Sequence, residues 1–354
     1  MATDINSIHT PAFVVNEAVA LQNIAAFQAH CDQVGLALRP HIKTHKSVHF
    51  AKAQLAAGAN GITCQKISEA EAMAVDGIDD ILITYNILGD AKLRRLRALS
   101  ERLTALAVVA DNMVVINGLS RTFSGASEPL KVLVECDTGA GRCGVQSPEA
   151  AVALAEKIAV LPGLQFGGLM TYPAVGGAKN AAEFLRETKK LLDECGLACP
   201  VISSGGSPDM WSATTDGIIS EYRIGTYIYN DRSLVRAGAC TWDECAGHVV
   251  ATVVSTPTPE RAIIDAGSKV LTSDLLGFTD HGHVVGHPEI RVVGLSEEHG
   301  TLSVDPQNPL AIGQRIRIVP NHVCVVSNMF DEIWIEGSDG NLAQLSIDAR
   351  GRVI

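Results

Sequence analysis

The sequence lacks the features of a chain that spans or crosses a membrane. No stretch of its 354 residues approaches the run of about 18 apolar residues that indicates a transmembrane helix. The first residues, MATDINSIHTPAFVV, contain no basic segment followed by an apolar segment, which is the arrangement of a secretion signal. We therefore expect a cytoplasmic protein without a membrane partner.

Positive charge and paired cysteines are also scarce. The net charge of -11 at pH 7 would repel the phosphate backbone of a nucleic acid and an anionic lipid surface. The nine cysteines are odd in number and follow no CxxC spacing, which fits reduced thiols better than a disulfide framework. These absences leave a small molecule as the expected partner.

What the sequence does contain is a strand-and-helix unit that recurs along its first two thirds. The helical segments include 147–161, where Ser147 can cap the helix and Pro148 fits its first turn. Strands that alternate with helices imply parallel strands with right-handed crossovers, and eight of them close a TIM (β/α)8 barrel. An open doubly wound sheet is the alternative, but its Gly-rich turn after the first strand is missing. The eight predicted strands are 35–43, 60–66, 79–86, 104–111, 131–137, 164–172, 199–206 and 218–226.

Beyond residue 240 the pattern changes. Segments such as AGHVVATVV and DEIWIEG alternate apolar and polar residues, are rich in Val, Ile and Thr, and are separated by Gly, Pro, Asn and Asp. We predict an α/β barrel domain over residues 1–240 and a smaller all-β domain over residues 241–354.

The stretch LRPHIKTHK, which begins at Leu38, places charged groups in a predicted buried strand. Side chains alternate across a strand, so Arg39, His41 and Lys43 should point toward the barrel axis while Leu38 and Ile42 face the helices. Their burial would cost several kcal/mol unless charge partners or a ligand meet them. Lys43 ends the strand at the edge where such barrels carry their chemistry. A desolvated lysine there suits a Schiff base, whereas a lone lysine is more often an ordinary loop residue.

Two loops with small residues could bind an anion at the same edge. Glycines and small hydroxyls let backbone N–H groups approach an anion closely, and the loops after the seventh and eighth strands of such barrels commonly hold phosphate. The SGGS sequence alone is more often a turn. Together with Lys43, however, the two loops point to pyridoxal 5'-phosphate (PLP) as the cofactor. The residues concerned are Ser204, Gly205 and Gly206 in the first loop, and Gly225, Thr226 and Tyr227 in the second.

The motifs RPHIKTHK, DTGAGRCGV, GLMTY, SSGGSP, EYRIGTY and PNHVC resemble the D-threonine aldolase and D-serine dehydratase family, whose PLP enzymes share the alanine racemase-like barrel. The likeness spans nearly the whole chain, and RPHxKTHK with PNHxC is its most specific part. The resemblance implies that Lys43 forms the Schiff base, with His41 beside it, and that the two loops surround the phosphate. It makes Arg142 and Tyr172 candidates for contacting the pyridine nitrogen or the ring face.

A third candidate element is VPNHVCVVSN in the β-domain. On a strand, His322 and Cys324 would project from the same face, close enough to bind one metal ion. A His-x-Cys sequence alone is more often a packed histidine and a buried thiol. In the family that the chain resembles, however, this place holds a divalent metal beside the cofactor. Thiolate and imidazole ligands favour Zn²⁺, with Mn²⁺ as the other candidate.

The resemblance implies a lyase that acts on β-hydroxy-D-amino acids. Aldol cleavage would give glycine and an aldehyde, whereas dehydration would give a 2-oxo acid and ammonia. Aldolases of the family pair the metal histidine with aspartate and carry another histidine after the tyrosine of the sixth strand. Here the chain has Cys324 and TYPAVGGAKN, which favours dehydration of D-serine or D-3-hydroxyaspartate. Bacterial members are mostly aldolases, so we place D-threonine aldolase activity first.

Two other functions are less well supported. A PLP carrier without catalytic activity would not need a β-domain that bears a metal pair. An amino-acid racemase would need a tyrosine base from the second domain, yet Tyr222, Tyr227 and Tyr229 all precede that domain. The fold relatives also imply a homodimer.

Overall fold

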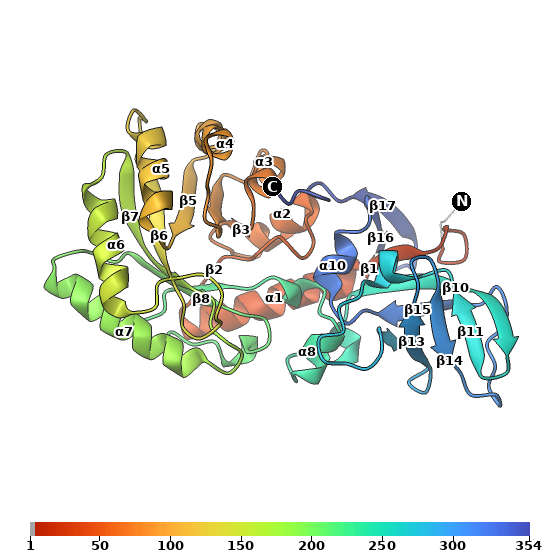
Figure 1. Ribbon diagram of the computed structural model, residues 1–354. Coiled ribbons are helices and arrows are strands. Elements are labelled where there is room, and N and C mark those ends of the chain that lie inside the picture. Colours follow the sequence, from red (N-terminus) through yellow and green to blue (C-terminus); the bar gives the residue numbers. More distant parts are fainter. Residues whose placement is uncertain (1–3) are drawn as a thin grey trace. The chain divides into compact units, whose positions relative to one another are not determined.

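The computed structural model describes residues 4–354, which form two compact units (Figure 1). We call them the barrel unit and the β unit. Among residues 4–354, none of the helices combines the length and the apolar character needed to span a bilayer. The barrel unit comprises Ala26–Lys43, Val48–Gly225 and Arg352–Ile354, and the β unit comprises residues 4–25, Thr44–Ser47 and Thr226–Gly351.

Eight parallel strands form the centre of the barrel unit, in the order β2-β9-β8-β7-β6-β5-β4-β3. A bridge between His41 and Thr63 joins the chain beyond β2 to β3 and so brings the two edges together. The predicted fold class and all eight predicted strands are confirmed. The bounds are β2 Ala37–Leu38, β3 Ile62–Cys64, β4 Asp80–Ile83, β5 Ala105–Ala110, β6 Leu130–Cys136, β7 Leu164–Thr171, β8 Val201–Gly205 and β9 Glu221–Arg223.

The first strand is shorter than the sequence pattern predicts. Pro40 has no N–H group and therefore interrupts the ladder of hydrogen bonds. The backbone nevertheless stays paired on both sides beyond it, because His41 N donates to Ile224 O at 2.7 Å and Thr63 N donates to Pro40 O at 2.7 Å. Lys43 consequently lies in a turn directly after this paired stretch.

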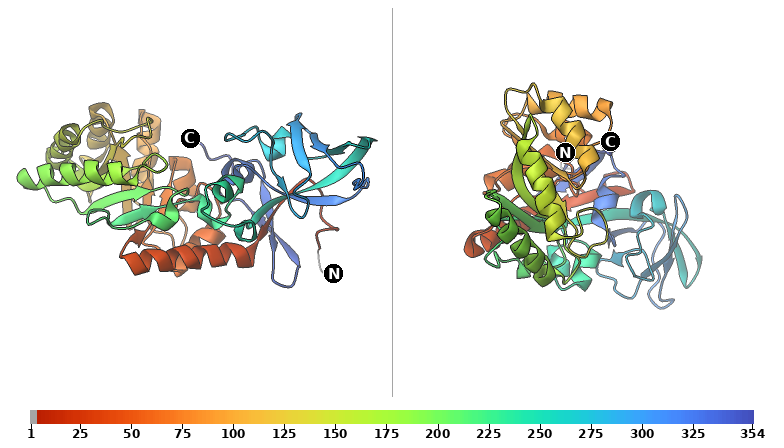
Figure 2. Two further views of the ribbon diagram at one scale, coloured as in Figure 1. Left: turned by 90° about the horizontal axis from the view of Figure 1, so that it is seen from below. Right: turned by 60° about the vertical axis from the view of Figure 1, so that its left-hand side comes forward.

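Helices cover the outer side of the parallel strands (Figures 1 and 2). Helix α6 begins at Pro148 as predicted, and the Ser147 hydroxyl accepts a hydrogen bond from Ala150 N at 3.2 Å. The inner side is filled by a buried cluster of Leu82, Met170 and their neighbours from β5 and β6. The helices are α1 Glu17–Val34, which continues from the β unit, α2 Val48–Ala56, α3 Ile67–Met73, α4 Asp90–Ser100, α5 Met113–Phe123, α6 Pro148–Val160 and α7 Ala178–Glu194.

The β unit contains a nine-stranded, mostly antiparallel sheet, as the alternating pattern after residue 240 predicts. The order is β11-β14-β13-β12-β15-β10-β1-β16-β17, and β10 also pairs with β11. Its strands are β1 Ala12–Asn16, β10 Gly247–Thr258, β11 Arg261–Ile264, β12 His283–Val284, β13 Arg291–Leu295, β14 Gly300–Ser303, β15 Arg315–Val319, β16 Glu332–Glu336 and β17 Leu342–Ser346; its short helices are α8 Arg232–Arg236, α9 Ser268–Leu271 and α10 Val323–Ser327.

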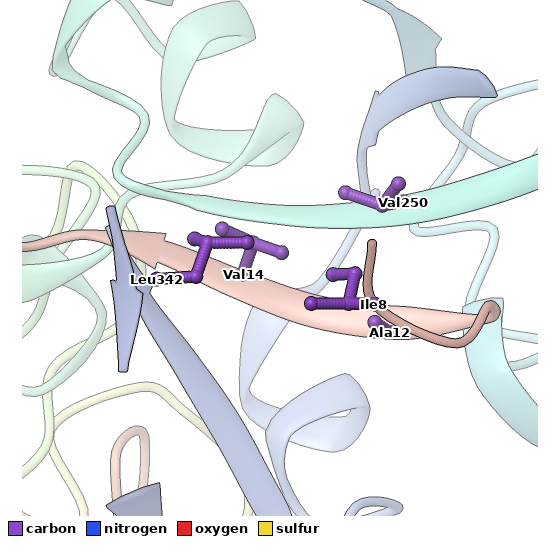
Figure 3. Close-up of a cluster of buried hydrophobic side chains, with 5 residues drawn as sticks. All are labelled: Ile8, Ala12, Val14, Val250 and Leu342. Atoms are coloured by element: carbon purple, nitrogen blue, oxygen red, sulfur yellow. The ribbon is translucent and has the colours of Figure 1, made fainter. Parts of the chain in front are cut away.

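Strand β1 places the start of the chain in the β unit. It pairs antiparallel with β10 and parallel with β16. Ile8, Ala12 and Val14 pack there against Val250 and Leu342 (Figure 3). The compact units are therefore not consecutive in the chain, unlike the predicted domains 1–240 and 241–354. The run AFVV has the composition of a buried strand, but composition does not say which sheet a strand joins.

Candidate active site

Arg39, directly after the first barrel strand, does have charge partners. Arg39 Nε lies 2.7 Å from Glu221 Oε2, and Arg39 Nη1 lies 2.8 Å from Asp80 Oδ1. Glu221 also accepts a hydrogen bond from the Ser203 hydroxyl at 2.6 Å. Arg39 is therefore neutralised inside the barrel unit, which offsets the cost of its burial. Its Nε, Nη1 and Nη2 each donate a hydrogen bond to one of these two carboxylates.

His41 holds the turn that contains Lys43. Its Nδ1 accepts a hydrogen bond from the backbone N–H of Lys43 at 3.3 Å, and its Nε2 lies 3.0 Å from Gln65 Oε1. The Gln65 amide is oriented in turn, because its Nε2 donates to Thr84 O at 2.8 Å. A neutral imidazole that carries its proton on Nε2 satisfies both contacts. His41 thus acts on the backbone of Lys43.

The side chain of Lys43 fits the role of the cofactor lysine. It is half buried, and within the part of the chain that the structure describes no group pairs with its Nζ. Lys46, three residues later, is only 5% exposed, and its Nζ lies 3.4 Å from Ala349 O. An unpaired, half-buried amine is available for Schiff-base formation, whereas Lys46 has a structural partner.

The two serines at the start of the first predicted anion-binding loop have different hydrogen-bond partners. The Ser203 hydroxyl accepts a hydrogen bond from Arg223 Nη1 at 2.6 Å and is used by the barrel itself. The buried Ser204 hydroxyl has no hydrogen bond among the described residues and remains available for a ligand. A Cβ at Gly205 would lie 1.8 Å from Arg223 O, so only glycine fits there. Ser204, Gly205 and Gly206 line one pocket together with Tyr172 and Tyr222.

The second loop lies where the chain passes between the two units. Gly225 ends a segment of the barrel unit, and Thr226 begins a short 3-10 helix, Thr226–Ile228, in the β unit. Tyr227 is buried with 1% exposure. Thr226 Oγ1 lies 3.5 Å from Cys324 Sγ. Contact of these three residues with a phosphate stays a prediction.

The structure brings Arg142 and Tyr172 together. The Arg142 guanidinium lies over the Tyr172 ring, 4.9 Å from its centroid. Both residues follow strands of the barrel, β6 and β7, and both are exposed. Their contact is a cation–π interaction, which leaves the guanidinium N–H groups available to other acceptors.

The strand prediction for His322 and Cys324 is wrong. Strand β15 ends at Val319, His322 is the residue before α10, and Cys324 lies within that helix. Pro320 cannot continue the hydrogen-bond ladder of the strand. The buried carboxylate of Asp231 accepts a hydrogen bond from Val323 N at 3.1 Å, which stabilises the first turn of the helix.

The two predicted metal ligands nevertheless lie together. A hydrogen bond between the side chains of His322 and Cys324 raises the pKa of His322 to about 9, against the opposing effect of burial. His322 Nδ1 lies 3.1 Å from Asp274 Oδ2, and Thr44 Oγ1 lies 3.1 Å from Cys324 Sγ. A carboxylate on Nδ1 fixes the imidazole orientation and directs Nε2 to a metal. An imidazole and a thiol in contact are a donor set that Zn²⁺ fits.

The sequence analysis did not single out Asp274 or Glu135. Asp274 lies 48 residues before His322 with no spacing that links them. Glu135 had a detectable signal, because it is a charged residue on the face of β6 that also carries the buried Leu133. The same alternation argument that selected Lys43 would have selected Glu135.

Comparison with known proteins identifies the family. Residues 15–233 match the model of the alanine racemase N-terminal domain, and residues 246–335 match the model described as a putative serine dehydratase domain. The chain is 35% identical to D-threonine aldolase of Arthrobacter sp over 97% of its own length and 93% of that protein. This chain belongs to the D-threonine aldolase and D-serine dehydratase family. The resemblance of its motifs is thereby confirmed.

Solved structures of the D-threonine aldolase and D-serine dehydratase family share the whole fold. D-threonine aldolase from Filomicrobium marinum superposes with a TM-score of 0.91 at 29% identity, covering 100% of this chain and 99% of that one. A cysteine-to-alanine mutant of D-threo-3-hydroxyaspartate dehydratase, in the metal-free form, superposes with a TM-score of 0.89 at 28% identity and covers 97% and 98%. A further mutant of that dehydratase replaces a histidine two positions before that cysteine.

Proposed function

We propose that this protein is a PLP- and divalent-metal-dependent lyase that acts on β-hydroxy-D-amino acids. The observation that carries the proposal is the unpaired Nζ of Lys43 at the carboxyl edge of the barrel strands, directly before Thr44, whose hydroxyl lies 3.1 Å from Cys324 Sγ. The relatives named D-threonine aldolase, 3-hydroxy-D-aspartate aldolase and D-serine dehydratase support this substrate class.

Bound PLP would supply an electron sink for the negative charge that develops at the substrate Cα. Lys43 Nζ would hold the cofactor and would take or return a proton at Cα. The Ser204 hydroxyl and the backbone N–H groups of Gly205 and Gly206 would bind the phosphate. His41 would keep the Lys43 turn in place through its hydrogen bond to Lys43 N.

A divalent metal held by His322 and Cys324 would act as a Lewis acid toward the β-hydroxyl oxygen. Asp274 would keep the His322 ring in the orientation that binds the ion. With only two ligands from the chain, the remaining coordination positions would be open to water and substrate. Zn²⁺ suits the thiolate and imidazole pair, and Mn²⁺ is the other candidate.

We place retro-aldol cleavage to glycine and an aldehyde first. The chain is 35% identical to the Arthrobacter D-threonine aldolase, against 28% for the D-threo-3-hydroxyaspartate dehydratase of Delftia sp. and 26% for the D-serine dehydratase of Dictyostelium discoideum. Specificity within such families depends on a few side chains, so overall identity is a weaker guide to the reaction than the site.

Dehydration to a 2-oxo acid and ammonia is the second candidate, and Cys324 favours it. The spacing of His322 and Cys324 equals that of the histidine and cysteine replaced in mutants of the dehydratase. The cysteine mutant is described in a metal-free form, which supports a role for this cysteine position in metal binding. The same Lys43 would serve both reactions, because the choice concerns which bond at Cα breaks.

The deciding experiment supplies D-threonine, D-serine and D-threo-3-hydroxyaspartate to the protein loaded with PLP and Zn²⁺ or Mn²⁺. Glycine with an aldehyde identifies aldol cleavage, and ammonia with a 2-oxo acid identifies dehydration. The L-enantiomers should be poor substrates. Interconversion of D- and L-forms without either product set would contradict the lyase proposal and favour a racemase, and no conversion of any substrate would favour a PLP carrier. A homodimer and a cytoplasmic location stay predictions.

A further inference from the structure

Asn321 directly precedes the proposed metal ligand His322, and the proposed function gives its side chain no role. This side chain is only 1% exposed. Both N–H groups of its amide nevertheless find an acceptor, because Nδ2 lies 2.7 Å from Asp280 O and 3.2 Å from Asp274 O. A buried amide with both donors satisfied holds its partners at fixed places. Asn321 thus ties the residue next to His322 to two points of the 272–282 loop.

Arg232 fixes the orientation of this amide. Its Nη1 donates to Asn321 Oδ1 at 3.1 Å, so the amide oxygen faces the guanidinium and Nδ2 faces the two carbonyl groups. The same nitrogen lies 3.1 Å from Gly282 O and 2.5 Å from Asp280 Oδ1. The guanidinium of Arg232 therefore contacts both Asn321 and the end of the 272–282 loop, and it supports the connection between them.

The 272–282 loop depends on such contacts for its conformation. Thr272 and Leu276 have positive φ angles of 63° and 47°, which residues with a Cβ rarely adopt. Strained backbone of this kind persists only where the surrounding structure holds it. The two hydrogen bonds that Asn321 donates to the loop lie on either side of Leu276 in the chain. Loss of the Asn321 amide should therefore release the loop.

Asp274 relies on this loop backbone for the position of its carboxylate. Its Oδ2 lies 3.1 Å from His322 Nδ1, and among the residues described, 4–354, the carboxylate has no other hydrogen bond or ion pair. The side chain is 42% exposed, so packing does not fix it. The distance from this carboxylate to the imidazole consequently depends on where the Asp274 backbone is held, and Asn321 holds that backbone at its carbonyl oxygen.

We propose that Asn321 is a positioning residue for the metal site, which holds the backbone of Asp274 at the place from which its carboxylate orients the His322 imidazole. The inference rests on the proposed function, in which His322 binds the metal ion. Asn321 needs no contact with the metal or the substrate for this role. It is bonded to His322 in the chain and hydrogen-bonded to Asp274, so it sets the spacing between the ligand and its orienting carboxylate. All of these residues belong to the β unit.

The direct test measures the dissociation constant of Zn²⁺ for the full-length protein by titration with a competing chelator. We expect Asn321→Ala to weaken Zn²⁺ binding by about 10-fold, the lower end of the range found for groups that orient a metal ligand. In the Asp274→Asn background the same change should add less than about 2-fold, because the carboxylate that Asn321 positions is already lost. Leu302→Ala, which truncates a fully buried side chain of β14, should destabilise the fold and leave the dissociation constant unchanged.

Two results of this titration would overturn the positioning role. One is a dissociation constant in Asn321→Ala equal to that of wild type. The other is the same fold-change on loss of Asn321 in the wild-type and Asp274→Asn backgrounds, which would mean that the two residues act independently. Absence of Zn²⁺ and Mn²⁺ binding in the wild type would instead contradict the proposed metal site itself, and this result is distinct from either of the other two.

A second measurement needs neither metal nor cofactor. The amide N–H of Phe278 donates to Leu275 O, and that of His281 donates to Val292 O, so both report on the loop. We expect both amides to exchange hydrogen faster in metal-free Asn321→Ala than in metal-free wild type, because the loop opens more often. Asn321→Asp keeps the size of the side chain and the acceptor for Arg232 but loses both donors, so it should act in the same way. Exchange at the wild-type rate in both variants would show that Asn321 does not hold the loop.

Discussion

The hydroxyl of Thr44 lies 3.1 Å from the thiol of Cys324, and the Ser327 hydroxyl donates to the Thr44 carbonyl oxygen. Both contacts lie within the β unit, where Thr44–Ser47 belongs. Because Thr44 directly follows Lys43 in the chain, the residue next to the proposed cofactor lysine is held by the helix that carries the proposed metal thiol. The RPHIKTHK and PNHVC motifs are thus in direct contact through two residues that lie 280 positions apart in the chain.

The first prediction concerns the cofactor lysine. Reduction of the PLP-loaded protein with borohydride should fix the cofactor on Lys43, and peptide mapping should find the label there. Lys43→Ala should lose the visible absorbance of the bound cofactor, because the amine that forms the Schiff base is removed. The matched control is Lys46→Ala, which should keep the label on Lys43. Label on Lys46 in the wild type would show that the assignment is wrong.

Metal removal should separate catalysis from cofactor binding. If His322 and Cys324 hold a Lewis acid, a chelator should abolish turnover while the absorbance of bound PLP persists, and Zn²⁺ or Mn²⁺ should restore activity. The double substitution His322→Ala and Cys324→Ala should give the same inactive, PLP-loaded protein, and added metal should not rescue it. Cys195→Ala, at an exposed cysteine just after α7, serves as the control. Full activity in the double variant would refute the metal site.

Asp274 should matter for metal affinity rather than for folding. Its Oδ2 lies 3.1 Å from His322 Nδ1, and neither side chain is deeply buried, with 42% and 31% exposed. We expect Asp274→Asn to weaken the binding of Zn²⁺ by about 10–100-fold, since the orienting carboxylate is lost. Titration with a competing chelator measures the dissociation constant. An unchanged constant would mean that Asp274 does not orient the metal-binding imidazole.

Glu135 should make the stability of the fold depend on pH. Its pKa is raised from 4.5 to about 7 in the folded state, so the folded state binds more protons than the unfolded state between these values. Stability therefore falls as the pH rises through this window, and Glu135→Gln should gain up to about 3 kcal/mol relative to wild type between pH 4 and pH 8. Chemical denaturation at several pH values measures the difference. Glu128→Gln, at an exposed position before β6, should show no such trend, and a parallel trend in both variants would contradict the assignment.

Periodicity and residue spacing were sufficient to predict the architecture from the sequence. The eight parallel strands, helix α6 with its Ser147 cap and the change to an antiparallel sheet after residue 240 all follow from local patterns. These features depend on which residues neighbour each other along the chain, because the local pattern of apolar residues marks the buried face of each strand or helix. The two motifs RPHxKTHK and PNHxC together likewise sufficed to recognise the family, because a motif can be recognised without knowledge of the fold.

Contacts between distant segments were decided by the tertiary structure alone. The sequence does not show that β1 joins the sheet of the β unit, that Asp274 lies against His322, or that Asp231 accepts a hydrogen bond from Val323 N at the start of α10. Each of these depends on a partner at least 48 residues away. The sequence by itself determined which elements form and which chemistry-bearing residues the chain carries. Only the packed fold decided which of those residues meet, because side-chain partners and burial are properties of the folded chain and not of a local pattern.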